Sequence, residues 1–171
     1  MILSDMGIRE YLKKGIISIR PLKGDQIGPA SVDLSLSGEW AFFKKSLIGK
    51  TVDLDKVPFQ KATVKVRADY AILNPGEIVL ATTAEKITLP SNIMGKLEGR
   101  SRYARMGLSV HITSAIVQPG SDNHQVLEIL NSAPFAIVLR KGMRVSQIVF
   151  HQMKSPTSKP YSKFGKIAKK Q

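Results

Sequence analysis

Apolar and polar residues alternate at short intervals along most of the chain, and turn-forming residues interrupt this alternation repeatedly. Glycine, proline, asparagine and aspartate gather in the gaps, as in residues 24–29 and 118–123. Many short strands at close spacing predict a β-sandwich or barrel of jelly-roll type. The strand-like stretches are residues 16–22, 31–43, 62–68, 71–90, 107–117, 124–131, 135–140 and 144–153.

Helical periodicity is confined to two places. In residues 1–14, Ile8, Tyr11 and Leu12 fall on one face of a helix that Ser4 or Asp5 can cap and Gly15 can end. Residues 101–107, which follow Gly99 and Arg100, predict a short helical turn. The pattern therefore predicts a mainly β protein with one or two short helices.

Length and composition narrow the class of protein. The 171 residues suit one domain, and no internal repeat is visible. The chain contains no cysteine, which excludes disulfides, thiolate-bound zinc and a cysteine nucleophile. No apolar run approaches the roughly 20 residues of a membrane span, and the start lacks the basic and apolar segments of a leader. We expect a soluble, cytoplasmic protein that does not enter membranes.

Positive charge is concentrated late in the chain. The formal net charge is +13, and from residue 99 onward twelve lysines and arginines face only Asp122 and Glu128. An anionic partner is expected, and a nucleotide, a nucleic acid or a merely solvated basic surface would each account for the charge. The lysine-rich end predicts a mobile arm over residues 155–171, following a single domain over 1–154.

Residues 99–128 combine three arginines with one acid set among apolar neighbours. Arg100, Arg102 and Arg105 lie within a few positions of one another, and Glu128 follows a P-G turn. A carboxylate among apolar residues needs a partner or a use, so the segment indicates a site where cations and a poised acid converge. The alternatives are a surface cluster of the arginines with Glu98 and a plain acid on an edge strand.

Five motifs in register resemble the dCTP deaminase and dUTPase superfamily, and the dCTP deaminases in particular. They are PASVDLSL at 29–36, EGRSRYARMGL at 98–108, HIT at 111–113, QPG at 118–120 with VLEILN at 126–131, and RKGMRVSQIVF at 140–150. The resemblance implies a distorted jelly roll of the dUTPase-like β-clip kind, a homotrimer with sites between subunits, and a magnesium-bound deoxynucleoside triphosphate as substrate. It also implies catalysis without zinc.

The resemblance implies particular roles for residues of this chain. Glu128 matches the acid that takes a proton from water attacking C4 of cytosine, a task that calls for a raised pKa in a dry pocket. Ser101 and Arg105 match residues that hold the water and the base, and Arg100 matches a phosphate contact. The implied reaction is deamination of dCTP to dUTP and ammonia. Further substrate contacts are implied for Arg102, Gln118, Val126, Leu127, Tyr161 and Lys163.

Departures from the family pattern keep other functions open. Gln118 stands where the family has an aspartate that activates water in diphosphatases, and an amide cannot act as that base. Arg102 replaces a serine or threonine, and GKIAKKQ replaces the usual end of the closing arm. A dUTP diphosphatase, a bifunctional enzyme and a non-catalytic nucleotide-binding protein are the alternatives. Nucleic-acid binding is disfavoured because no row of exposed aromatic residues accompanies the charge.

The remaining histidines and one aspartate are interpreted as structural. His124 and His151 lack metal-ligand spacing, so no metal site is expected. His111 is interpreted as a structural histidine rather than a base. Asp33 is interpreted as a scaffold residue that holds a loop near the site.

Overall fold

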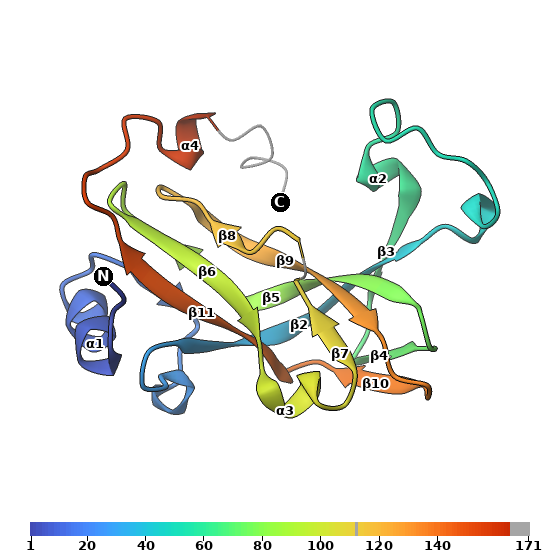
Figure 1. The fold of residues 1–171 in the computed structure, drawn as a ribbon, viewed down its shortest axis with the longest axis horizontal. Helices are drawn as coiled ribbons and strands as arrows, with labels where there is room; N and C mark the ends of the chain where they lie inside the picture. Colours follow the sequence, from blue (N-terminus) through green and yellow to red (C-terminus); the bar gives the residue numbers. More distant parts are fainter. Residues whose placement is uncertain (112, 165–171) are drawn as a thin grey trace.

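The chain folds as a curled, mainly antiparallel β structure with few short helices (Figure 1). The computed structural model describes residues 1–111 and 113–164. The mainly β, jelly-roll-type prediction is confirmed. In chain order the elements are α1 (Asp5–Lys13), β1 (Ser18–Arg20), η1 (Gly24–Gln26), β2 (Val32–Phe43), η2 (Lys45–Leu47), α2 (Phe59–Ala62), β3 (Thr63–Arg67), β4 (Tyr70–Leu73), β5 (Ile78–Thr88), β6 (Ile93–Gly99), α3 (Ser101–Ala104), β7 (Leu108–Val110), β8 (Ile116–Val117), β9 (Asp122–Asn131), β10 (Ile137–Arg140), β11 (Arg144–Gln152) and α4 (Tyr161–Phe164).

The main sheet follows the order β7-β9-β5-β2-β11-β6-β8, with β1 added beside β5 and β3 beside β2. Strand β2 pairs with β11 near its beginning and with β3 and β5 near its end, so it passes from one part of the curled sheet to the other. Strands β4 and β10 form a separate antiparallel pair. Alternate residues of β2 and β5 are buried, as expected for strands that cover a core on one face.

The helix predicted at the N-terminus is present as α1. The Ser4 hydroxyl accepts a hydrogen bond from the Gly7 amide at 3.4 Å, and Ile8 is fully buried. The turn predicted over 101–107 is present as α3. The short helices α2 and α4 and strand β6 were not predicted from the sequence. No helix among the described residues is both long and apolar enough to cross a membrane.

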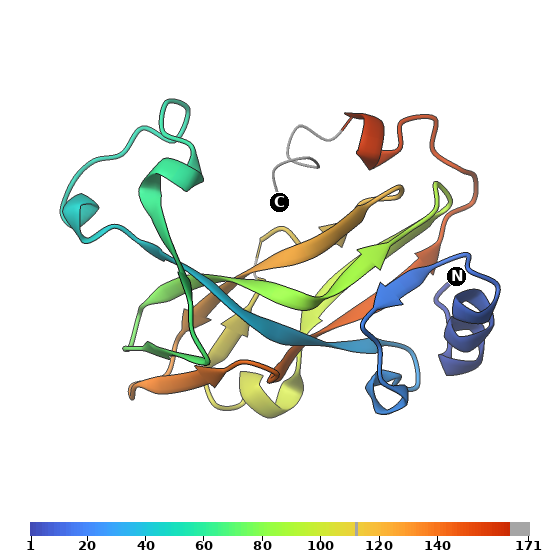
Figure 2. The same ribbon diagram turned by 180° about the vertical axis from the view of Figure 1, so that it is seen from behind.

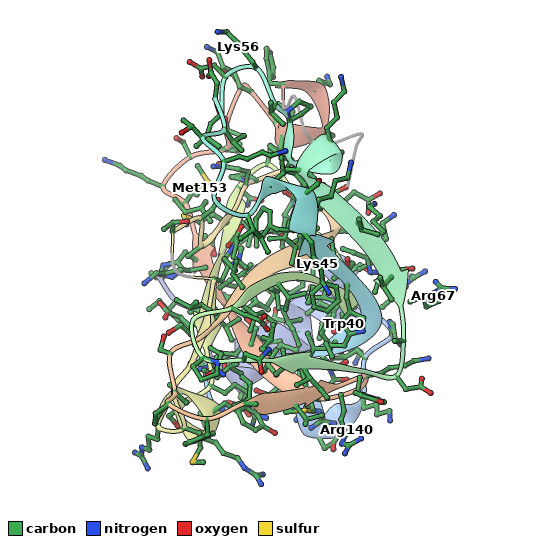
Figure 3. The ribbon with its side chains drawn as sticks, turned by 90° about the vertical axis from the view of Figure 1, so that its right-hand side faces the viewer. Trp40, Lys45, Lys56, Arg67, Arg140 and Met153 are labelled. Carbon is green, nitrogen blue, oxygen red and sulfur yellow. The ribbon has the colours of Figure 1, made fainter. Side chains whose placement is uncertain are left out.

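Residues 44–62 form an excursion that projects from the sheet beside β3 (Figure 1). Lys56 on this excursion and Arg140 on β10 lie at opposite ends of the molecule, whereas Trp40 lies inside it (Figure 3). The Trp40 side chain is 2% exposed, and its indole N–H donates to the Ala68 carbonyl at 3.0 Å. Trp40 is therefore a core residue.

The helical turns that bear on function lie on opposite sides of the molecule. In both views η1 and α3 lie along one side, and α4 lies along the other, near the ends of β6 and β8 (Figures 1 and 2). Residues far apart in the sequence thus meet at each side, and each group is described separately below.

Candidate functional site

A polar cleft opens between η1 and the beginning of α3. Its volume is about 280 Å³, and polar side chains dominate its lining. Three of the predicted site residues, Arg100, Ser101 and Arg102, line it together with Asp33. The other lining residues are Asp25, Gln26, Ile27, Gly28, Pro29, Ser31 and Gln147.

Arg100 is held in a defined orientation at this cleft. It follows the last residue of β6, and its carbonyl accepts hydrogen bonds from the Tyr103 and Ala104 amides at the beginning of α3. Its guanidinium group pairs with the Asp33 carboxylate at 3.0 Å and donates to the Arg144 carbonyl at 3.1 Å. Because both contacts restrain the side chain, Arg100 presents a fixed cation to an anionic ligand.

Two carboxylates with different electrostatic environments flank the arginines. Asp25 accepts two hydrogen bonds from the Arg144 guanidinium, each 2.9 Å long, and these bonds hold the pKa of its carboxyl below the usual value. Burial raises the pKa of the Asp33 carboxyl, and Arg100 and Arg144 only partly offset that rise. Asp33, interpreted from the sequence as scaffold, is thus part of the cleft itself.

Ser101, Arg102 and Arg105 are exposed around α3. Arg102 lies over the ring of Tyr103, with 5.6 Å from its guanidinium carbon to the ring centre. The Ser101 and Arg105 side chains have no partner among the described residues. Glu98 pairs with Lys96 rather than with the arginines, so the alternative of an arginine cluster neutralised by Glu98 is wrong.

Glu128 lies elsewhere, on the outer face of β9. Leu127 and Ile129 point into the core and are fully buried, whereas the Glu128 side chain is 34% exposed. Its Oε2 approaches Nδ1 of His111 to 3.0 Å. Both atoms are shielded from solvent and the approach is not a well-aligned hydrogen bond. The pair is therefore close enough to exchange a proton after a small rotation.

The surroundings of His111 determine where protons can reside. Its Nε2 lies 2.6 Å from the Ser114 carbonyl, which can only accept, so Nε2 carries a hydrogen. The remaining ring nitrogen faces a carboxylate, and the contact is attractive only when one further proton lies on Nδ1 or on Glu128. His111 also adopts a φ angle of +59°, which is uncommon for a residue other than glycine.

The electrostatics at Glu128 differ from the sequence-based expectation of a raised pKa. The His111 imidazole beside it holds the pKa of the Glu128 carboxyl below its usual value, although burial alone would raise it. The expectation assumed that apolar sequence neighbours surround the side chain. Leu127 and Ile129 instead lie on the opposite face of the strand.

Replacing His111 with asparagine is expected to raise the pKa of Glu128, since it removes the imidazole and leaves a neutral amide that tolerates positive φ. A ¹³C NMR titration of the Glu128 carboxyl carbon measures this shift. A carboxyl whose pKa is lowered on folding stabilises the fold above its ordinary value of 4.5, and that contribution is lost as pH falls through the folded value. The free energy of unfolding should therefore fall less in the variant than in the wild type as the pH is lowered.

His124→Asn is the matched control. His124 lies on β9, the strand of Glu128, but its ring nitrogen contacts the Thr83 carbonyl instead of the Glu128 carboxylate. An unchanged Glu128 titration in His111→Asn contradicts the assignment of His111 as its electrostatic partner.

The QPG turn and the C-terminal segment form a third group. The Tyr161 amide donates to the Pro119 carbonyl at 2.9 Å, and the Ser162 amide donates to the Gly120 carbonyl at 3.3 Å. A Cβ at Gly120 would lie 2.6 Å from Pro160, so this close approach requires glycine. Gln118 is exposed on the turn, with Tyr161 and Lys163 beginning and continuing α4 nearby.

Residues 155–164, the described part of the arm, lie against their own subunit at this turn. The mobility expected of the arm stays a prediction. The departure GKIAKKQ is residues 165–171, which lie outside the described residues.

Within one chain, these three groups lie on different elements. Strand β7 lies between α3 and His111, because Leu108 pairs with Asn131 and Val110 pairs with Ile129, next to Glu128. Three strand residues span about 10 Å. Val126 shares the outer face of β9 with Glu128, whereas the Leu127 side chain is fully buried and could reach a ligand only through its backbone. The proposed ligand contacts of all these residues stay predictions.

No group of three histidine, aspartate or glutamate side chains with the geometry of a metal site occurs in the described parts of the chain. What the described residues offer is a polar cleft with arginine side chains at its edge, a carboxylate paired with an imidazole, and a turn closed by the C-terminal segment. The first can bind an anion and the second can transfer a proton.

Sequence comparisons agree with the sequence resemblance. A family profile described as dCTP deaminase-like matches residues 2–153. A Methanosphaera stadtmanae protein named "dCTP deaminase, dUMP-forming" is 39% identical over 94% of this chain and 83% of its own length. A Rhodospirillum rubrum protein named "dCTP deaminase" is 39% identical over 95% of this chain and 88% of its own length.

Solved structures with a similar fold include a deaminase and a dUTPase. The 2′-deoxycytidine 5′-triphosphate deaminase from Agrobacterium tumefaciens is 26% identical with a TM-score of 0.70, and the match covers 88% of this chain and 48% of that one. The EIAV dUTPase is 18% identical with a TM-score of 0.54, over 84% of this chain and 94% of that chain. The second match supports the fold alone.

Proposed function

The chain belongs to the dCTP deaminase-like family, and we propose that it hydrolyses dCTP to dUTP and ammonia as a cytoplasmic enzyme of pyrimidine deoxynucleotide metabolism. The observation that carries the proposal is the half-buried Glu128 carboxylate on β9, with its imidazole partner 3.0 Å away. Deamination needs an acid that transfers protons, whereas nucleotide binding alone does not need one.

Glu128 acts as the proton carrier in this proposal. Its carboxylate takes a proton from water as the oxygen forms a bond to C4 of cytosine, and it delivers that proton to N3 of the ring. Glu128 then takes the remaining proton from the new C4 hydroxyl and passes it to the exocyclic amine, so the C4–N bond breaks, the C4 carbonyl forms and ammonia leaves. Because His111 favours the carboxylate form, Glu128 is ready to accept the first proton at neutral pH.

The cleft beside α3 binds the triphosphate in this proposal. Arg100 is oriented by Asp33, and Arg102 is exposed beside it, so the two guanidinium groups can engage phosphate oxygens. Magnesium enters as part of the substrate, carried by the triphosphate. Ser101 and Arg105 have side chains free of partners among the described residues, which leaves them available for the attacking water and the base.

A homotrimer with sites between subunits accounts for the separation of these groups. One chain supplies the arginines of α3 and its neighbour supplies Glu128. Unpaired apolar surface supports assembly: Ile72 and Val138 lie directly opposite each other on β4 and β10, with exposed fractions of 52% and 43%. Such a pair of apolar side chains on one exposed face suits a subunit interface.

Product analysis tests the reaction and separates the alternatives. We expect purified protein with Mg²⁺ to convert dCTP to dUTP with little dUMP, because the Gln118 amide cannot activate water at the α-phosphate. The name of the Methanosphaera relative makes the dUMP-forming activity the specific competing candidate. Chromatography of reactions with dCTP and with dUTP distinguishes the two products.

Gln118→Asp is the informative variant for the same assay, since it restores a carboxylate on the turn and should increase dUMP relative to dUTP. Abundant dUMP from the wild-type protein contradicts the role given to Gln118. Binding of nucleotide without turnover of dCTP or dUTP supports the non-catalytic alternative instead.

A further inference from the structure

Glu85 is a buried acid that the proposed reaction does not use. It lies on β5 and is 2% exposed. Its Oε1 accepts from the Gln26 amide at 2.8 Å and from the Ser35 hydroxyl at 2.6 Å, and its Oε2 accepts from the Ser35 backbone N–H at 2.8 Å. No lysine, arginine or histidine pairs with it in the described residues. A buried carboxyl group held only by neutral donors is costly, so its retention calls for an explanation.

The Gln26 side chain connects Glu85 to the cleft. Its amide nitrogen donates to Glu85 and also to the Asp33 carbonyl at 2.9 Å, and its oxygen accepts from the Lys23 amide at 2.8 Å. Gln26 is 4% exposed and closes η1. The contact with Glu85 therefore holds η1 against β5, and the contact with the Asp33 carbonyl holds it against β2.

A closed circuit of hydrogen bonds and ion pairs runs around the cleft, beginning and ending at Gln26. Asp25, the preceding residue, holds the Arg144 guanidinium through two bonds of 2.9 Å. The Arg144 carbonyl accepts from Arg100 at 3.1 Å, and Arg100 pairs with Asp33 at 3.0 Å. The Asp33 carbonyl accepts from Gln26, which closes the circuit. Each member restrains the next, and Glu85 supports the circuit from the interior.

We propose that Glu85 is a positioning residue that orients Arg100 for phosphate binding through Gln26. The inference rests on the proposed function, because it assumes that the cleft binds the triphosphate. In this proposal Glu85 touches neither substrate nor the reacting atoms, because Glu128 lies on the neighbouring strand β9 opposite Leu80, five positions along β5 from Glu85. Loss of Glu85 should therefore weaken substrate binding and leave the chemical step largely intact.

Glu85→Gln is the direct test. The amide keeps the size of the side chain but places an NH₂ group against donors, so the contact with Gln26 or with the Ser35 amide is lost. We expect the KM for dCTP to rise about tenfold, which is the effect of losing one well-placed contact, with kcat changed less than about twofold. Calorimetry with inorganic tripolyphosphate should show a similar weakening, since this probe needs the cleft and no deamination.

Gln26→Met approaches the same contact from the other side and keeps the test informative if Glu85→Gln does not fold. Both variants should give the same rise in KM, and the double variant should cost little more than either one. Thr63→Val is the control for stability, because Thr63 is buried on β3 and its hydroxyl donates to the Phe59 carbonyl rather than to any member of the circuit. It should lower the melting temperature without raising KM.

Binding measurements distinguish a failure of the positioning role from a failure of the proposed function. Wild-type protein that binds tripolyphosphate, together with Glu85→Gln and Gln26→Met proteins that bind it equally well, refutes the positioning role and leaves the proposed function intact. A fall in kcat at unchanged KM also refutes it. Wild-type protein that binds neither dCTP nor tripolyphosphate refutes the phosphate cleft, and the positioning role with it.

Discussion

Replacing Glu128 with glutamine is expected to reduce dCTP turnover by a factor of about 10³ or more while substrate binding changes little. Proton transfer by a positioned side chain contributes roughly 10²–10⁴ to such reactions, and glutamine has the shape of glutamate without its basicity. The amide can still approach Nδ1 of His111, so the local structure should survive. Single-turnover kinetics measure the chemical step, and calorimetry with dCTP measures binding.

Glu98→Gln is the matched control, since Glu98 is an exposed acid on β6 whose partner is Lys96. It should turn over dCTP at the wild-type rate. If Glu128→Gln also retains wild-type turnover, the proton carrier must be another group and the proposed mechanism is wrong. A variant that loses binding as strongly as turnover instead indicates that Glu128 holds the base rather than moving protons.

The strands of this fold were largely predictable from local pattern, and the exception has a physical cause. Strand β6 was missed because IMGKLEG has glycine where a strand pattern expects a side chain. Gly95 is required there, because a Cβ would lie 2.5 Å from the Ile148 side chain on the neighbouring strand. The available signal was the apolar pair Ile93 and Leu97, which share a face of the strand with Gly95.

The candidate site was less predictable, because its geometry depends on contacts between distant segments. The sequence brought Arg100, Glu128 and Gln118 to attention but treated them as one cluster, and only the strand register separates them. His111 was interpreted as structural because nothing in its neighbours indicates that β7 places it beside Glu128. Asp25, Arg144 and Glu85 drew no attention, since their roles arise from pairings across fifty or more positions.

If active sites form between subunits, two inactive variants should restore activity when they assemble together. Arg105→Ala removes a residue of α3, and Glu128→Gln removes the acid on β9, so each variant alone should be nearly inactive. In a mixed trimer, one of the three sites can take its arginines from one chain and its acid from the other. Co-expression with two different tags, followed by purification on both, should therefore yield about one third of wild-type activity per trimer.

The control for this experiment pairs two variants from the same half of the site. Arg100→Ala and Arg105→Ala both alter the residues around α3, so no mixed trimer of these chains contains an intact site. Restoration by Arg105→Ala with Glu128→Gln, and none by the arginine pair, establishes that α3 and β9 of different chains act together. Double-tagged trimers without activity in both mixtures contradict the shared site, and recovery of no double-tagged protein contradicts the assembly itself. If either result is obtained, another arrangement must bring α3 and Glu128 to one substrate. One chain cannot bring them together without breaking the pairing of β7 with β9.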